Sequence, residues 1–222
     1  MPCFNGNPKV PPEEQRRYRA QVLRSIKEGR KLAPQFRSTA PEFDLATLGL
    51  TANSVIADIG CGTGAFEFTM LERRHPFGKL YAVDIDDRAL DFLDFALDAS
   101  HLPGRQRITT VQSSWDDVRL PLRSVDVVLL HNTRFGMRQG DAPLQGAQLR
   151  QRDRAMTSLK RALRPGARIF VHEPTRTFGT DKPFNEKYIS EPFLAHGFVR
   201  LSSRKIEVDQ DQMVQVVFAL KR

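Results

Sequence analysis

A glycine-rich stretch at residues 55–66, with the sequence VIADIGCGTGAF, constrains the fold more than any other feature of this chain. An apolar run ends in Asp58, three glycines follow at alternate positions, and an amphipathic segment then begins. This order predicts a buried strand, a tight turn and the start of a helix. Glycine lets the backbone approach a ligand closely, and amide groups at a helix N-terminus face whatever occupies the gap. The stretch is therefore typical of a loop that holds a nucleotide-like cofactor.

From residue 54 onward, apolar strand patterns alternate with amphipathic helical patterns. The strand patterns lie at residues 55–58, 79–84, 108–112, 124–131, 167–172, 198–208 and 213–220. The helical patterns lie at residues 65–74, 87–99, 148–163 and 191–195. The run at 124–131 is almost continuously apolar, as in parallel strands buried on both faces. We therefore expect an α/β fold with a doubly wound seven-stranded sheet, mostly parallel and closed by a C-terminal antiparallel hairpin.

The first 50 residues differ from the rest of the chain. Prolines and acids at 11–14 predict the start of a helix that runs to about residue 32, and residues 42–48 predict a second, short helix. A chain of 222 residues is long enough for one sizeable core. We therefore expect a helical N-terminal extension that acts as a lid at residues 1–50, and one Rossmann-like domain at residues 51–222.

The composition limits the partners and the compartment. The net charge of +8 invites a nucleic-acid partner, but the basic residues are interleaved with acids in predicted helices, where a solvated face explains them. No apolar run has the length of a membrane span, and residues 1–30 lack the apolar centre of a signal peptide. The two cysteines fit a reducing compartment, so we expect a cytoplasmic protein. The five histidines are scattered and predict no metal site.

Two types of cofactor compete for the glycine loop. The sequence GCGTGA at 60–65 satisfies the G-x-G-x-x-A form of the dinucleotide-binding motif, which would indicate an NAD(P)-dependent oxidoreductase. Asp58 argues against that cofactor, because an acid two residues before the first glycine repels a pyrophosphate and attracts a cationic ligand. None of the three tyrosines has a lysine four positions later, as a short-chain dehydrogenase would need. A cationic cofactor with a single nucleoside is therefore favoured.

The same residues carry a resemblance to a known family. Residues 55–66, together with YAVDID at 81–86, resemble motifs I and II of class I S-adenosylmethionine-dependent methyltransferases. The resemblance extends from about residue 54 to the end of the chain. It is greatest for the small-molecule, type 11-like group, which has an L-x-P-G turn before the fifth strand, here LRPG at 163–166. The [N/D]-P-P-[Y/F] motif of enzymes that methylate amino groups of DNA and of protein glutamine is absent after the fourth strand.

The resemblance implies that the cofactor is S-adenosyl-L-methionine. The positions that would contact it are Asp58, Gly60, Cys61, Gly62, Gly64, Asp84, Ile85, Trp115, Asp116, His131 and Asn132. Asp84 would accept both ribose hydroxyls, since the alternative role, an N-cap for the next helix, suits Asp86 better. Ile85 would pack on the adenine face, and Cys61 is a small packing residue between glycines rather than a nucleophile.

Other positions would hold the adenine edge and the methionine part of the cofactor. Asp116 matches the acid that accepts the adenine amino group in this family, and Asp117 is the next candidate. Trp115 could occupy the same edge by stacking. The family's backbone contacts to the methionine part fall at His131 and Asn132.

Two side chains at strand ends are candidates for acting on the methyl acceptor. His131 could deprotonate an acceptor hydroxyl, because its unperturbed pKa lies near neutrality, although a structural histidine is an equal alternative. Glu173 follows the fifth strand on the same side of the sheet and could orient a polar substrate.

These observations favour one function and leave two alternatives open. The favoured function is methyl transfer from S-adenosylmethionine to a small-molecule acceptor by in-line displacement, with alignment and water exclusion as the main tasks of the protein. The first alternative is an RNA or protein methyltransferase, motivated by the net charge of +8. The second is the NAD(P)-dependent oxidoreductase. The oligomeric state is not predicted.

Overall fold

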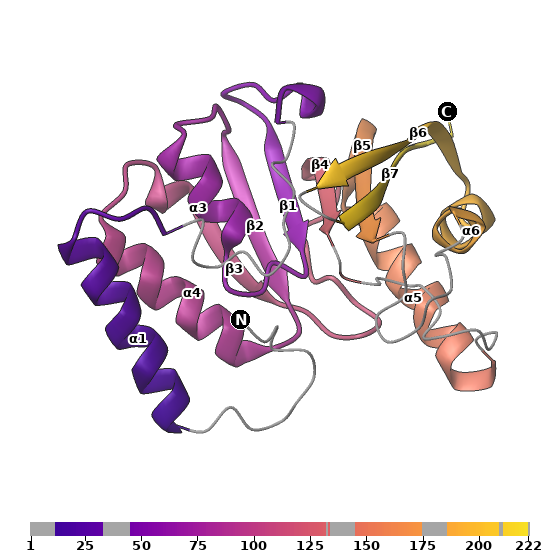
Figure 1. Cartoon of the computed structure of the whole chain (residues 1–222). Helices are drawn as coiled ribbons and strands as arrows, with labels where there is room; N and C mark the ends of the chain where they lie inside the picture. The colour runs from indigo at the N-terminus through magenta and orange to yellow at the C-terminus, as the bar shows by residue number, and fades with distance from the viewer. Residues whose placement is uncertain are drawn as a thin grey trace.

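A seven-stranded sheet with the order β3-β2-β1-β4-β5-β7-β6 forms the centre of the molecule (Figure 1). This computed structural model describes residues 12–32, 45–131, 133, 145–174, 186–208 and 211–221. The strands are β1 (Val55–Ile59), β2 (Lys79–Asp84), β3 (Ile108–Gln112), β4 (Val125–His131), β5 (Leu163–Pro174), β6 (Phe198–Val208) and β7 (Asp211–Leu220). The first five strands pair in parallel, and β7 runs antiparallel to both β5 and β6. The expected sheet and its terminal hairpin are confirmed.

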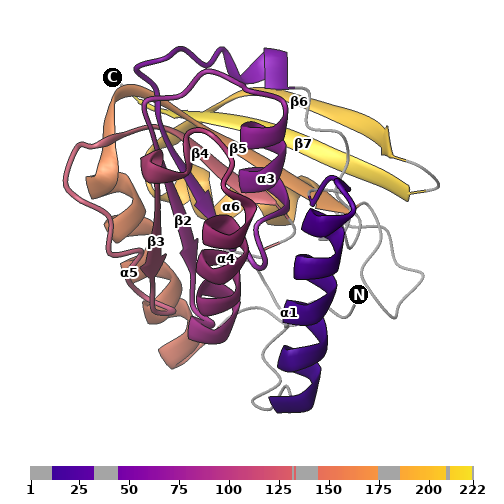
Figure 2. The same cartoon turned by 90° about the vertical axis from the view of Figure 1, so that its left-hand side faces the viewer.

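Helices cover both faces of the sheet, as the two views show (Figures 1 and 2). The helical elements are α1 (Pro12–Lys27), η1 (Leu45–Leu48), α3 (Ala65–Glu72), α4 (Asp87–Ser100), η2 (Arg105–Arg107), α5 (Gly146–Ala162) and α6 (Glu186–Ala195). Residues of α3 and α4 belong to the core on one face, and residues of α5 and α6 belong to the core on the other. Among the described helices, none combines the length and the apolar character that a membrane crossing requires.

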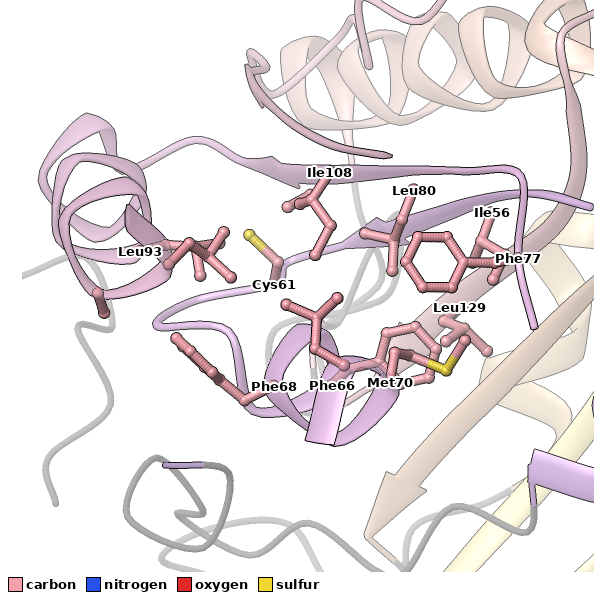
Figure 3. Packing of buried hydrophobic residues seen from close by; sticks show 14 of the residues in the cluster. Ile56, Cys61, Phe66, Phe68, Met70, Phe77, Leu80, Leu93, Ile108 and Leu129 are labelled. Carbon is pink, nitrogen blue, oxygen red and sulfur yellow. The ribbon is translucent and has the colours of Figure 1, made fainter. Parts of the chain in front are cut away.

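Alternate residues of the central strands enter two separate cores, because side chains on a strand alternate between its faces. Ile56 of β1 and Leu129 of β4 pack into the first core with α3 and α4, which Figure 3 shows from close by. Ala57 and Leu130 enter the second core with α5 and α6. Asp58 follows the alternation of Ile56, so it lies on the face of the first core, close to the carboxyl ends of the strands.

The described part of the N-terminal extension packs on α4. Val22 of α1 is buried in the first core, and the ring of Tyr18 meets the ring of Phe92 edge-on at 6.2 Å. The Arg19 guanidinium lies 5.0 Å from the centre of the Phe95 ring. The helix ends at Lys27 and not at residue 32 as expected, and the turn that follows has a glycine with a φ of +65° at position 29.

Several other boundaries differ from expectation. Helix α3 ends at Glu72 rather than residue 74, α5 spans Gly146–Ala162 rather than 148–163, and α6 begins at Glu186 rather than 191. The largest difference is the expected turn at 163–166, which lies inside β5. Val125 pairs with Leu163 and Val127 with Arg168, so the additional residues form a bulge in the strand. Proline and glycine mark bulges as well as turns, which is why the sequence pattern was misread.

Candidate functional site

The glycine loop folds back onto the end of β2. The backbone N–H groups of Gly60 and Cys61 both donate to the carbonyl oxygen of Val83, at 2.7 and 3.1 Å. Gly60, Gly62 and Gly64 all have positive φ, at 82°, 55° and 91°. This is the left-handed region that glycine adopts without strain. The loop therefore needs these glycines for its backbone conformation alone.

The space around the three glycines differs. A Cβ atom at Gly60 would lie 2.3 Å from the Thr133 side chain, and one at Gly64 would lie 2.2 Å from the Leu93 side chain. A Cβ atom at Gly62 would meet no atom within 4 Å. Gly60 and Gly64 thus allow close packing within the protein, whereas Gly62 faces open space where a ligand could approach the backbone.

Asp84, at the end of β2, holds the loop from the other side. Its carboxylate accepts the N–H of Gly62 and the N–H of Asp86, both at 2.9 Å. Burial raises the pKa of Asp84, and the backbone hydrogen bonds partly offset that rise. The N-cap of α4 is Asp86, which accepts the N–H of Arg88 at 3.1 Å. Asp84 therefore does not cap the helix, and its carboxylate keeps lone pairs that could accept ribose hydroxyls.

Two buried acids lie behind the loop, and the sequence pattern pointed to only one of them. Asp58 is 4% exposed, and Glu67, in the first turn of α3, is 0% exposed. Neither carboxyl oxygen of Glu67 has a hydrogen-bond partner among the described residues. Burial and the charge of Asp84 raise the pKa of Asp58 to about 7. Burial, and then Asp58, raise the pKa of Glu67 well above its ordinary value. A glutamate in the first turn of a helix ordinarily indicates a solvated partner of the helix dipole, so no sequence signal singles out Glu67.

Cys61 completes the inner side of the loop. Its thiol is buried, and burial raises its pKa well above the ordinary value. Cys61 belongs to the first core, which it shares with Leu93 of α4 (Figure 3). A buried thiol with a raised pKa is not an activated nucleophile, which agrees with the expected packing role.

The expected adenine contacts lie at the ends of β2 and β3. Ile85 is 37% exposed and Trp115 is 62% exposed, so both present apolar surface at this edge. The carboxylate of Asp116 accepts from the Arg154 guanidinium at 2.9 Å and from the Ser114 hydroxyl at 2.8 Å.

Asp117 lies beside Asp116 and has hydrogen-bond partners of its own. It accepts from the Ser158 hydroxyl at 2.5 Å and from the N–H of Arg119 at 2.9 Å. The hydrogen bonds lower the pKa of both Asp116 and Asp117, so both are carboxylates at neutral pH. Each acid joins the loop after β3 to α5.

A row of polar side chains crosses the sheet beyond the loop, on the face of the first core. His131 of β4 pairs with His172 of β5, His172 with Gln215 of β7, and Gln215 with Arg204 of β6. The Arg204 Nε–H donates to Gln215 Oε1, and Gln215 Nε2 donates to His172 Nε2, both at 2.5 Å. The two imidazole rings meet edge-on with their centres 5.9 Å apart.

Both imidazoles of this row are neutral at physiological pH. Burial lowers the pKa of His131 to about 4. Burial, His131 and then Arg204 lower the pKa of His172 to about 3. Sequence reasoning identified His131 but gave no role to His172, Gln215 or Arg204, because their relation is one of strand register and only the folded sheet shows it.

Glu173 holds the segment that follows β4. It is 1% exposed, and its carboxylate accepts the N–H of Thr133 at 3.1 Å. The Thr133 side chain in turn lies against Gly60. Glu173 thus connects the end of β5 to the glycine loop through one residue. Asn132, another expected cofactor contact, lies outside the described residues.

Two further features lie away from this edge of the sheet. A surface hollow of about 340 Å³ is lined by residues of α3, of the turn after it and of the segment before β3, among them Met70, Arg74 and Arg107. It lies near the amino end of β3, whereas the glycine loop and Asp84 lie at the carboxyl ends of the strands, so it is separate from the site. Within the described residues, no three acids, histidines or cysteines are grouped so that they could hold a metal ion.

Comparisons with known proteins agree with this geometry. A family model described as a methyltransferase domain matches residues 56–166. A methyltransferase dependent on S-adenosylmethionine from Aquifex aeolicus has a TM-score of 0.62 at 17% identity, over 88% of this chain and 97% of that one. One from Methanosarcina mazei has a TM-score of 0.61 at 14% identity, over 82% and 100%. The glycopeptide N-methyltransferase MtfA, solved with S-adenosylmethionine, has a TM-score of 0.60 at 13% identity, over 80% and 92%. The search of curated proteins finds no match.

The chain therefore belongs to the methyltransferase domain family. It is an S-adenosylmethionine-dependent methyltransferase with the class I fold, similar to the type 11-like group. Its residues fit the cofactor, because Gly62 leaves the backbone open, Asp84 offers a carboxylate, and the acids behind the loop favour a cation. The family match gives no support to the NAD(P)-dependent oxidoreductase.

Proposed function

We propose that the enzyme transfers a methyl group from S-adenosylmethionine to a small molecule. The observation that carries this proposal is the neutral character of the polar row next to the cofactor loop, among the residues that the structure describes. His131, His172 and Gln215 are uncharged hydrogen-bonding groups, and the positive charge of Arg204 lies three strands away from β4. A nucleic-acid acceptor would instead require a cluster of cations close to the reacting centre.

The proposed cofactor site uses the residues expected from the sequence. Gly60, Cys61, Gly62 and Gly64 form the loop, and Asp84 accepts the ribose hydroxyls. The adenine lies between Ile85 and Trp115, with Asp116 at its edge, and Asp58 favours the cationic end. The backbone of His131 and Asn132 meets the methionine part. The exposed apolar surfaces of Ile85 and Trp115 and the open space at Gly62 support this arrangement.

The bound cofactor supplies an activated methyl group. The protein therefore needs to align the acceptor with this methyl group, exclude water from the two reactants and remove a proton from the acceptor. We propose that His131, as a neutral imidazole, accepts a hydrogen bond or a proton from the acceptor. Glu173 is buried and accepts the N–H of Thr133, so we propose that it positions the segment after β4. Alignment of the two reactants supplies most of the acceleration.

We propose that residues 1–50 act as a lid over residues 51–222. The packing of α1 on α4, through Tyr18 and Val22, supports a fixed place for this extension.

We also propose a cytoplasmic location. It is supported by Cys61, which is a buried free thiol, because free thiols are typical of a reducing compartment.

Methyl transfer to defined acceptor classes tests this function. The purified enzyme is incubated with labelled S-adenosylmethionine and, separately, with a panel of small hydroxyl and amine compounds, bulk RNA and bulk protein. We expect label in small-molecule products, with little loss when salt is raised. Label confined to RNA, with transfer that falls steeply as salt rises, would show a nucleic-acid methyltransferase instead.

A further inference from the structure

Glu67 lies in the first turn of α3, directly after the glycine loop. Its side chain lies wholly inside the protein, with no hydrogen-bond partner for either carboxyl oxygen among the described residues. The carboxyl group lies directly behind the third glycine, since a Cβ atom at Gly64 would be 3.5 Å from Glu67 Oε2. Burial of an unpaired carboxylate costs several kcal/mol in proteins, so such a group is protonated or paired.

The groups that face Glu67 are acids and a thiol. Asp58 approaches from β1 and Asp84 from β2, and Cys61 lies in the loop between them. Among the described residues, no lysine, arginine or histidine shifts the pKa of Asp58 or Glu67. Two buried carboxyl groups with no described cation nearby cannot both be charged, and a proton between them provides the hydrogen bond that Glu67 otherwise lacks.

We propose that Asp58 and Glu67 share one proton behind the glycine loop, and that binding of S-adenosylmethionine releases this proton to the solvent. The incoming positive charge replaces the proton as the partner of the two acids. Glu67 is then a residue that determines cofactor affinity without any need to touch the cofactor. The proposal rests on the cofactor site proposed above and does not depend on the identity of the acceptor.

The cofactor and its product differ in charge at the sulfur. S-adenosylmethionine carries a sulfonium in addition to its ammonium, whereas S-adenosylhomocysteine has a neutral sulfur. Binding of the first ligand should therefore release more of the proton to the solvent than binding of the second. Above neutral pH, where Asp58 is already ionised, the site should favour the sulfonium ligand most strongly.

Calorimetry in buffers of different ionisation enthalpy measures the released proton. At pH 6.5 we expect S-adenosylmethionine to release roughly one proton per site and S-adenosylhomocysteine clearly less. Glu67→Gln keeps the shape and leaves Asp58 as the only acid of the pair, so it should release clearly less than the wild type. It should also bind S-adenosylmethionine about tenfold more weakly at pH 8, the effect of one charge at moderate distance. Asp91→Asn removes an exposed acid of α4 and should change neither result.

The protein without cofactor gives a second, independent measurement. Because the pKa of Asp58 is about 7 when folded and 3.8 otherwise, the folded state holds the proton more tightly. The resulting stability is complete below about pH 4 and is lost as the pH rises towards 7. The melting temperature should therefore fall between pH 5 and pH 8, and fall less in Glu67→Gln.

Each outcome decides the proposal. Equal proton release in the wild type and Glu67→Gln would overturn it, as would a wild type that releases no proton between pH 6 and pH 8. If Glu67→Gln fails to fold, the wild-type difference between the two ligands decides instead. A protein that shows the pH-dependent melting but binds neither ligand would contradict the proposed cofactor site and the proton release that rests on it, while leaving the shared proton in place.

Discussion

At the scale of single residues, the three glycines of the loop have different tasks. All three have positive φ, but a side chain at Gly60 or Gly64 would collide with the protein, and one at Gly62 would not. The repeat of glycines in the sequence therefore combines two requirements: a backbone conformation shared by all three, and ligand access at the middle one.

Alanine substitutions separate these requirements. We expect Gly62→Ala to lower the free energy of unfolding by about 1 kcal/mol through its positive φ, and to weaken S-adenosylhomocysteine binding strongly. Gly60→Ala adds a collision with Thr133, so it should cost about 2–4 kcal/mol. Denaturant unfolding and ligand titration measure the two effects. Equal stability of the two variants would contradict the assigned difference.

Asp84 provides a second prediction at this scale. Asp84→Asn removes the negative charge that would accept the ribose hydroxyls, so we expect S-adenosylhomocysteine affinity to fall about 10- to 100-fold. The matched control is Asp86→Asn, because asparagine also caps helices and Asp86 is the N-cap of α4. Calorimetric titration of both variants checks this, and an equal loss in the two would refute the ribose contact.

At the scale of elements, the terminal hairpin does more than close the sheet. Through Gln215 of β7 and Arg204 of β6 it fixes the hydrogen bonding of His172, and His172 packs against His131 beside the glycine loop. Because Gln215 donates to Nε2, the neutral His172 carries its proton on Nδ1. Residues more than 40 positions apart in the chain therefore determine one tautomer.

Gln215→Glu should convert His172 from the neutral to the charged form. A carboxylate opposite His172 favours the charged imidazolium, so the pKa of His172 should rise from about 3 towards or above its ordinary value. Gln215→Met, which keeps the size and removes the donor, should leave the pKa low because burial remains the main cause. Nuclear magnetic resonance of labelled histidine measures the pKa and the tautomer. An unchanged pKa in Gln215→Glu would contradict the hydrogen-bonded row.

At the scale of the whole molecule, ligand binding couples to global stability. A ligand at 100 times its dissociation constant adds about 2.7 kcal/mol, which for a chain of this size raises the melting temperature by about 5–10 °C. We expect this rise with S-adenosylhomocysteine and none with NADH. Asp84→Asn should reduce this rise to about half or less at the same concentration. A rise with NADH alone would favour the oxidoreductase that the glycine motif formally permits.

The extent to which the sequence predicted the structure depended on the range of the interactions. β2, β3 and β6 were predicted at their observed bounds, since strand patterns bounded by turn residues are local. The beginning of β5 was wrong, because Leu163 already pairs with Val125 and only this pairing with β4 reveals it. The end of α1 was wrong because the residues beyond Lys27 leave the helix to pack, with Leu32 buried in the first core.

The sequence by itself determined the class of protein and the cofactor loop, because the glycines, Asp58 and Asp84 lie within 30 residues and their spacing reflects local backbone geometry. Only the tertiary structure decided which groups surround that loop. Glu67 is behind it because α3 is buried on nearly every side, and the row from His131 to Arg204 exists because four strands are in register. Burial and register arise from packing between segments that are distant in the chain. The buried positions that result shift the pKa values of the acids and histidines placed there.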